Sequence, residues 1–210
     1  EYKKIEPYLE LGEKLGSFLA QIVGGRVEEA RLSYDGGLAQ LNTHLVKNAV
    51  LKGILSRVLS EPVNLVNAGA LAQERGIEVL ELKSARRAAF SNSLGIALRT
   101  EAEVLSVLGM VVPQSGSGAL RILGISDIDI EAPLKGAILY IRNQDVPGVI
   151  GRVGTLLGDR KINIANFALG RNQKAQEAIG LVNVDNHIPE SLLEEIRAIP
   201  AIRVARVVEV

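Results

Sequence analysis

The sequence predicts an α+β protein with two domains, residues 1–133 and 134–210. Helical and alternating apolar patterns are mixed in the first part, whereas the second part repeats a regular order of strand and helix signals. The composition is 47% hydrophobic but only 3% aromatic, so the core must be built mainly from Val, Ile, Leu and Ala. With 210 residues, both domains can bury a core of their own.

The first domain is predicted to mix helices with strands. Its helices are expected where apolar residues recur three and four apart and where glycines follow: Glu6–Val23 before Gly24 and Gly25, Thr43–Ser60, and Ala68–Arg75 before Gly76. Its strands are expected at 27–34, 77–82, 94–98, 104–112 and 119–123, with a turn over 113–118 and a short edge strand within 126–133.

The second domain reads as strand, helix, strand, strand, helix, strand. The expected bounds are Ala137–Arg142, Pro147–Asp159, Ile162–Gly170, Ala175–Asp185, Pro189–Ala198 and Arg203–Val210. This βαββαβ order predicts a ferredoxin-like fold, with four antiparallel strands and both helices on one face. Such a small sheet leaves its edges unpaired, and we therefore expect two copies to associate.

The charge balance excludes several classes of partner. Lys plus Arg and Asp plus Glu both number 24, which argues against nucleic acid or an anionic membrane as a partner. No apolar run reaches the roughly 20 residues that a membrane span needs, and there are no cysteines. We expect a cytoplasmic protein. Because the chain begins at Glu1 without an initiator Met, we also expect it to be part of a longer protein.

The sequence offers little for catalysis. Its only histidines are His44, at a predicted helix start, and His187, in a predicted loop, and neither has a partner suited to acid–base chemistry. No nucleotide, hydrolase or metalloprotease motif occurs, and the paired acids give no metal site. Four glycines, at 148, 151, 154 and 158, have the wrong spacing for a nucleotide loop and favour close approach of another backbone.

A binding site is predicted where the strand 137–142 runs into the following helix. Asp145 and Asn163 offer oxygen atoms for an ammonium group, and the N–H groups of Val149 and Ile150, with the Asn143 amide, offer donors for a carboxylate. If these side chains meet at one end of the sheet, they suit a free amino acid. The alternative is purely structural: Asp145 caps the helix, Asn163 satisfies a turn and Asn143 ends a strand.

The segment "RNQDVPGVIGRVGTLLGDRKINIANFALGR" resembles an ACT domain, in the version that ends bacterial D-3-phosphoglycerate dehydrogenases. The runs "YLELGEKLGSFLAQI", "LNTHLVKNAVLKGILS" and "VNLVNAGALAQERGIEVLE" resemble the intervening domain of the long form of that enzyme. The resemblance implies feedback control of serine synthesis, with L-serine or another small amino acid bound where two ACT domains meet. The implied contacts are Asn143, Asp145, Val146, Pro147, Gly148, Val149, Ile150 and Asn163. Asn143 departs from the family, which often has His or Tyr there.

The resemblance also implies what lies outside this chain. NAD and the 3-phosphoglycerate site would belong to a missing catalytic portion, so the chain itself needs no cofactor and is expected to be inactive. Relatives use basic side chains of the intervening domain for an anion. The candidates are Arg86, Arg87, Arg99, Arg121 and Lys135, with Arg121 preferred. Two other functions stay open: the regulatory part of a serine dehydratase β portion, although its "SSSHT"-like stretch is missing, and a structural module that only holds an oligomer together.

Overall fold

The computed structural model describes residues 2–84, 92–113 and 118–210. Its contacts divide the chain into two compact units, Glu1–Ser126 and Asp127–Val210. The division falls before the short strand that the sequence analysis placed at the end of the first domain, because that strand packs within the second unit, as described below. Among the described residues, no helix combines the length and hydropathy needed to cross a bilayer.

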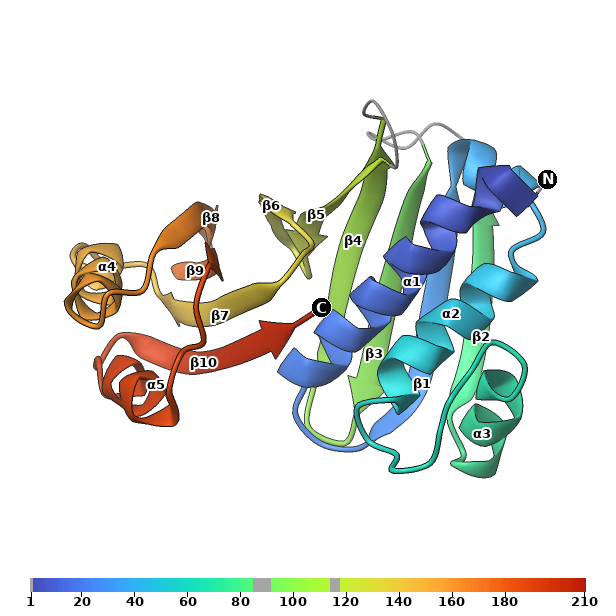
Figure 1. Ribbon diagram of the computed structural model, residues 1–210, viewed down its shortest axis with the longest axis horizontal. Helices are drawn as coiled ribbons and strands as arrows, with labels where there is room; N and C mark the ends of the chain where they lie inside the picture. The colour runs from blue at the N-terminus through green and yellow to red at the C-terminus, as the bar shows by residue number, and fades with distance from the viewer. Residues whose placement is uncertain (1, 85–91, 114–117) are drawn as a thin grey trace. The chain divides into compact units, whose positions relative to one another are not determined.

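The first unit has three helices and a sheet among its described residues (Figure 1). The elements are α1 (Tyr2–Ile22), β1 (Val27–Asp35), the 3₁₀ turn η1 (Gly36–Gln40), α2 (His44–Leu55), α3 (Ala68–Glu74), β2 (Glu78–Ser84), β3 (Ser93–Thr100), β4 (Val104–Val112) and β5 (Ala119–Ile125). Within this unit the strands lie in the order β2-β1-β3-β4-β5. Only β1 and β2 run parallel, and the other neighbours are antiparallel.

The predicted helices and strands of the first unit are confirmed, with two changes at helix ends, whereas the turn predicted over 113–118 lies mostly outside the described residues. Helix α1 begins at Tyr2, ahead of Pro7, and its first turn buries Ile5, which is 4% exposed. Helix α2 stops at Leu55 and not at Ser60, because Val58, beyond it, lies 64% exposed and adds nothing to the core. Burial of the apolar face thus decides where each helix ends.

Helices α1 and α2 lie on one face of the sheet and cross each other closely (Figure 1). Two glycines allow this approach. A Cβ on Gly16 would overlap the carbonyl oxygen of Val50, and a Cβ on Gly53 would overlap that of Glu13. The two helix backbones are therefore in direct contact at this crossing, which no larger residue permits.

A polar cluster links β1, β2 and α2. The Tyr34 hydroxyl donates to Glu81 Oε2 at 2.9 Å, and Lys47 Nζ lies 3.0 Å from Glu81 Oε1. Tyr34 has no exposed surface. Burial, together with the adjacent Glu81 carboxylate, raises the pKa of Tyr34 far above its ordinary value, so the phenol stays protonated.

The second unit has the predicted βαββαβ order, preceded by one short strand. Its elements are β6 (Ile128–Pro133), β7 (Ala137–Gln144), α4 (Val149–Asp159), β8 (Ile164–Asn172), β9 (Glu177–Val184), α5 (Glu190–Arg197) and β10 (Ile202–Glu209). The sheet order is β10-β7-β9-β8, with every pair antiparallel, which confirms the ferredoxin-like prediction.

Alternation along the strands separates the two faces of this sheet. Leu139, Ile141 and Val182 point to the face covered by α4 and α5 and form their core. On the other face β6 lies beside β8: a Cβ on Gly170 would come within 2.6 Å of the Asp129 carbonyl oxygen. This contact explains why β6 belongs to the second unit.

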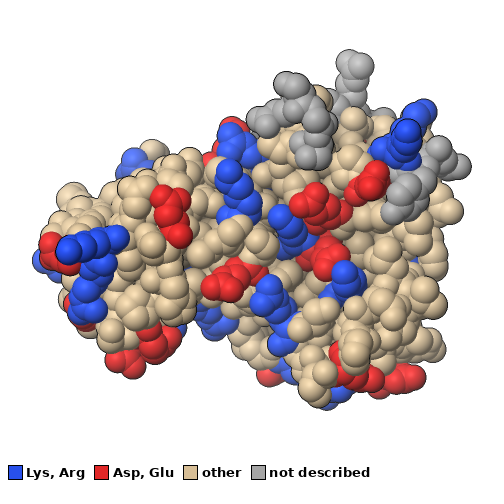
Figure 2. All heavy atoms as spheres, viewed as in Figure 1, with Lys and Arg blue, Asp and Glu red and all other residues tan. Residues whose placement is uncertain are grey.

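Charged side chains of both signs are interspersed over the face of the molecule shown in Figure 2. The ion pairs of the described residues include Lys52 with Glu13 at 2.7 Å and Arg197 with Glu190 at 2.6 Å. No patch of one sign dominates this face, in agreement with the balanced composition.

Candidate functional site

The turn between β7 and α4 is held in place by its backbone. The Gln144 N–H donates to the Ala201 carbonyl at 2.8 Å, and the Asp145 N–H donates to the Gln176 carbonyl at 2.9 Å. Gly148 then adopts a left-handed conformation, with φ of 93°, and serves as the N-cap of α4. Because this backbone turn comes after Pro147, the helix begins at Val149 and Pro147 lies outside it, which corrects the predicted start.

The N-terminus of α4 is not capped by any side chain. The first helical hydrogen bond of α4 is donated by the Arg152 N–H to the Gly148 carbonyl at 3.1 Å. The N–H groups of Val149 and Ile150 precede it and therefore point out of the helix end. Val149 is buried, whereas Ile150 is 43% exposed. The helix end offers donors and a positive dipole to an anion.

Asn143 lies near the end of β7 and is only 5% exposed. Its side-chain amide donates to the Gln144 carbonyl at 2.8 Å. In the sheet it pairs with Ile202 on one side and Ala178 on the other. Asn143 thus completes the end of the strand, as the structural alternative proposed, with one amide hydrogen already used.

Asp145 does not cap α4 but forms an ion pair with Arg171. Arg171 Nε lies 2.8 Å from Asp145 Oδ2, and the two side chains are 52% and 19% exposed. Arg171 was not among the predicted site residues, although it closes the family-like segment and is a lone basic residue near the end of β8. Its significance depends on strand register, which the sequence did not reveal.

Asn163 lies at the opposite end of the sheet from Asn143 and Asp145. Just before β8, it donates to Asp185 Oδ2 at 2.5 Å and accepts from the Asp185 N–H at 3.1 Å. The register places Ala137 beside Val184 at that end and Asn143 beside Ala178 at the other. Six strand residues separate the two ends, about 20 Å. The expectation that all three polar residues converge on one end of the sheet is therefore wrong within one chain, because α4 carries the chain back along the sheet and β8 starts at the same end as β7.

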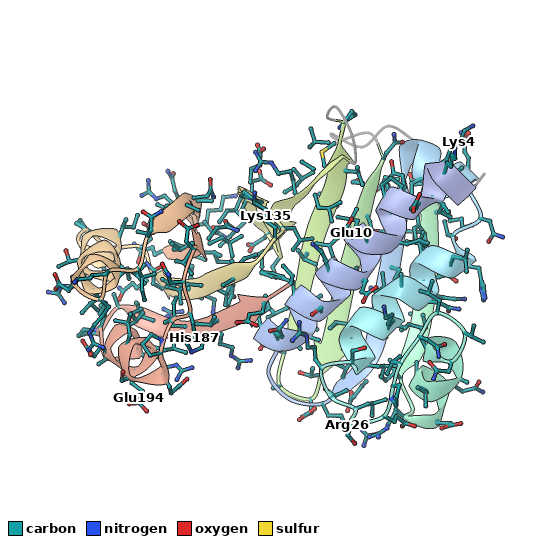
Figure 3. All side chains as sticks on the ribbon, in the orientation of Figure 1. Lys4, Glu10, Arg26, Lys135, His187 and Glu194 are labelled. Atoms are coloured by element: carbon teal, nitrogen blue, oxygen red, sulfur yellow. The ribbon has the colours of Figure 1, made fainter. Side chains whose placement is uncertain are left out.

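The basic residues predicted for an anion site do not form a described cluster. Arg86 and Arg87 lie outside the described residues. Arg99 is paired with Glu28 at 2.6 Å and lies 3.6 Å from Glu29. Arg121 lies on β5 opposite Met110, and Lys135 lies exposed between β6 and β7 (Figure 3). The anion site stays a prediction.

The histidines occupy the predicted positions. His44 begins α2 and is exposed, and its backbone N–H donates to Asn42 Oδ1 at 3.2 Å. His187 lies exposed in the loop that leads into α5 (Figure 3). In the part of the chain that the structure describes, no group of three or more His, Cys, Asp and Glu side chains is arranged to hold a metal ion.

Comparison with known proteins matches each unit to a family model. Residues 4–126 match the D-3-phosphoglycerate dehydrogenase intervening domain, and residues 137–201 match the ACT domain. The second match contains the β7–α4 turn and Asn163. The uncapped helix end and the Asp145 ion pair thus lie in the ACT domain.

Curated relatives match nearly the whole chain. The D-3-phosphoglycerate dehydrogenase of Bacillus subtilis is 35% identical over 96% of this chain and 38% of its own length. Those of Methanocaldococcus jannaschii and Synechocystis are both 36% identical, over 95% and 99% of this chain and 37% of their own lengths. A solved homoserine dehydrogenase from Thiobacillus denitrificans is 12% identical over 78% of this chain and 52% of its own, with a TM-score of 0.28, too low to equate the folds.

The chain therefore spans less than two fifths of the length of these dehydrogenases. Two family models in tandem and relatives of one name over both units agree with each other. The chain belongs to the D-3-phosphoglycerate dehydrogenase family, of which it carries the intervening domain followed by the ACT domain.

Proposed function

We propose that this chain is the regulatory region of a D-3-phosphoglycerate dehydrogenase and that its ACT domain binds L-serine for feedback inhibition. One observation carries the proposal: in the segment matched by the ACT family, a carboxylate, Asp145, lies three residues before the uncapped N-terminus of α4. A free amino acid carries an ammonium group and a carboxylate on the same carbon and needs a partner for each. Asp145 suits the first and the N–H groups of Val149 and Ile150 suit the second.

The site is completed by a second copy of the chain. Strand β8 is the edge of its sheet and has β9 as its only neighbour in that sheet. If two β8 edges pair antiparallel about a two-fold axis, the start of one strand lies beside the end of the other. This arrangement brings Asn163 of the partner subunit to the end that carries Asp145. Asp145 and Asn163, about 20 Å apart within one chain, thus come together when each is supplied by a different chain.

The open side of α4 suits the same association. A Cβ on Gly151, Gly154 or Gly158 would meet nothing within 4 Å. Three large apolar side chains are exposed among the described residues of this unit, Val146 at 39%, Ile150 at 43% and Leu169 at 41%. A second copy would cover these apolar atoms and the unpaired strand edge together.

Regulation follows from a ligand held by two copies. Serine bound between them favours one mutual arrangement of the ACT domains, and the domains attached to them carry that preference. Oxidation of 3-phosphoglycerate and NAD binding would belong to the part of the enzyme beyond this chain, which by itself is proposed to be inactive. No dinucleotide-binding fingerprint occurs in the sequence of this chain.

Calorimetric titration of the chain with L-serine tests the proposal. We expect saturable binding that Asp145→Ala and Asn163→Ala each abolish, and that Asp159→Ala, an exposed carboxylate at the far end of α4, leaves unchanged. Absence of binding to serine and to every other amino acid would leave an oligomerisation module instead. In the full-length enzyme, an undiminished rate with saturating serine would contradict feedback control even if the chain binds serine.

A further inference from the structure

We propose that Arg171 is a specificity-determining residue of the amino-acid site, whose guanidinium binds the ligand's carboxylate once the ligand's ammonium has taken its place on Asp145. This inference rests on the proposed function and adds a residue to that site. It starts from the ion pair at 2.8 Å between Arg171 Nε and Asp145 Oδ2. The carboxylate assigned to the ligand's ammonium already holds a cation.

The sheet register places Arg171 on the correct face for this role. Arg171 pairs with Ala178, and Ala178 pairs with Asn143, so the three lie in one row across β8, β9 and β7. Residues opposite each other in such a row point to the same face. This is the face of α4, because Ile141 and Val182, two or four residues along their strands, belong to the core under the helices. In this row the small side chain of Ala178 lies between the longer side chains of Arg171 and Asn143.

Charge balance favours an exchange of partners over a simple displacement. In the ion pair, one carboxylate and one guanidinium satisfy each other. A zwitterion inserted between them gives the order carboxylate, ammonium, carboxylate, guanidinium, so every charge keeps an opposite neighbour. An amine without a carboxylate would displace Arg171 and leave the guanidinium without its partner. The pair thus selects zwitterions over amines.

The exposure of the two side chains fits this exchange. Asp145 is 19% exposed and fixed by its backbone in the turn, whereas Arg171 is 52% exposed. The guanidinium can therefore move toward solvent and toward the N-terminus of α4 while Asp145 stays in place. Arginine suits a carboxylate because its planar fork can donate two parallel hydrogen bonds.

The same end of the sheet offers a matched control. Arg203 is 53% exposed and pairs with Glu177 at 2.5 Å. Glu177 precedes Ala178 in β9, so its side chain points to the opposite face of the sheet. Arg203→Ala therefore removes a similarly exposed arginine and a short ion pair without touching the proposed site.

The test compares L-serine with ethanolamine, which has serine's hydroxyl and ammonium but no carboxylate. Binding to the whole chain is followed by NMR chemical-shift titration, which measures weak affinities. We expect Arg171→Ala to weaken L-serine binding roughly tenfold to a hundredfold, the size of one charge-assisted interaction. Ethanolamine binding should stay unchanged or strengthen, because its ammonium no longer competes with the guanidinium. Arg171→Lys should keep part of the preference for serine, and Arg203→Ala all of it.

Two results would overturn the inference while the proposed function stands. Unchanged or tighter L-serine binding by Arg171→Ala would show that the guanidinium only competes for Asp145. An equal loss for serine and ethanolamine would show that it only supports the turn. If the unaltered chain binds no amino acid, the proposed function fails and this inference fails with it.

Discussion

Asp145 and Asn163 lie at opposite ends of the four-stranded sheet, each already bonded to a neighbour within its own chain. Asp145 pairs with Arg171, and Asn163 donates to Asp185. A ligand that needs both residues must therefore be held by two chains. This relationship gives the first prediction.

Chains carrying Asp145→Ala and chains carrying Asn163→Ala should restore binding when they are mixed. Unfolding and refolding them together gives heterodimers, in which one site takes Asp145 from one chain and Asn163 from the other. We expect L-serine binding to return in the calorimetric titration of this mixture. As the control, the double variant refolded alone should stay silent. No recovery, although heterodimers are detected by mass spectrometry, would contradict a site shared between copies.

Gly154→Leu should weaken self-association without unfolding the chain. Within one chain a Cβ at this position meets no atom within 4 Å, so the larger side chain has room. In the proposed dimer it would hold the partner backbone away. Sedimentation velocity should show a shift toward monomer. Arg152→Leu is the control, because two helical residues turn the side chain by about 200° and place it on the other side of α4. A dimer of unchanged strength in Gly154→Leu would exclude this side of the helix.

Gly53→Ala and Gly154→Ala should change stability in opposite directions. A Cβ at Gly53 overlaps the Glu13 carbonyl and forces α1 from α2, at a cost of about 2–3 kcal/mol. At Gly154 the same methyl group meets nothing and restricts the unfolded chain, a gain of about 0.5–1 kcal/mol. Urea unfolding followed by circular dichroism measures both. Equal effects of the two substitutions would mean that α1 and α2 do not cross at Gly53.

Tyr34→Phe should make the first unit less sensitive to alkali. The pKa of Tyr34 is raised in the folded chain, so its contribution to stability is complete below the unfolded pKa of about 10 and is lost as pH rises above it. Phenylalanine has no hydroxyl group to ionise, so the variant does not lose stability in this way at high pH. At neutral pH it should be less stable by about 1.5 kcal/mol, since the hydrogen bond to the Glu81 carboxylate is gone.

The measurement is the free energy of unfolding in urea at a series of pH values. The gap between unaltered chain and Tyr34→Phe should narrow from about pH 10 upward. Every other ionisable group is common to both proteins, so its effect cancels in the comparison. A gap that stays constant or widens over this range would contradict the raised pKa.

Strand and helix order was largely predictable because it depends on local apolar spacing. Leu94, Ile96 and Leu98 alternate and are all buried in β3, and β4 has the predicted bounds. Helix ends were less predictable. Ser56 to Ser60 has helical spacing, yet α2 stops at Leu55, and Val58 beyond it stays 64% exposed.

The candidate site was predictable only in part. The turn from Asp145 to Gly148 and the helix start after it could be recognised from the sequence, since Asp, Pro and Gly act on the backbone near them. Arg171 was not recognised, because it lies 26 residues from Asp145 and meets it only through the pairing of β8 with β9. Whether two residues so far apart in the sequence meet depends on strand register and not on local sequence.

By itself, the sequence determined the elements, their order and the ferredoxin-like fold of the second unit, because apolar periodicity, glycines and prolines act over a few residues. The tertiary structure alone decided which polar side chains meet. It paired Asp145 with Arg171, placed Asn163 at the far end of the sheet and left the edge of β8 without a strand beside it in that sheet. These outcomes follow from strand register and direction, which join residues that the chain itself keeps far apart.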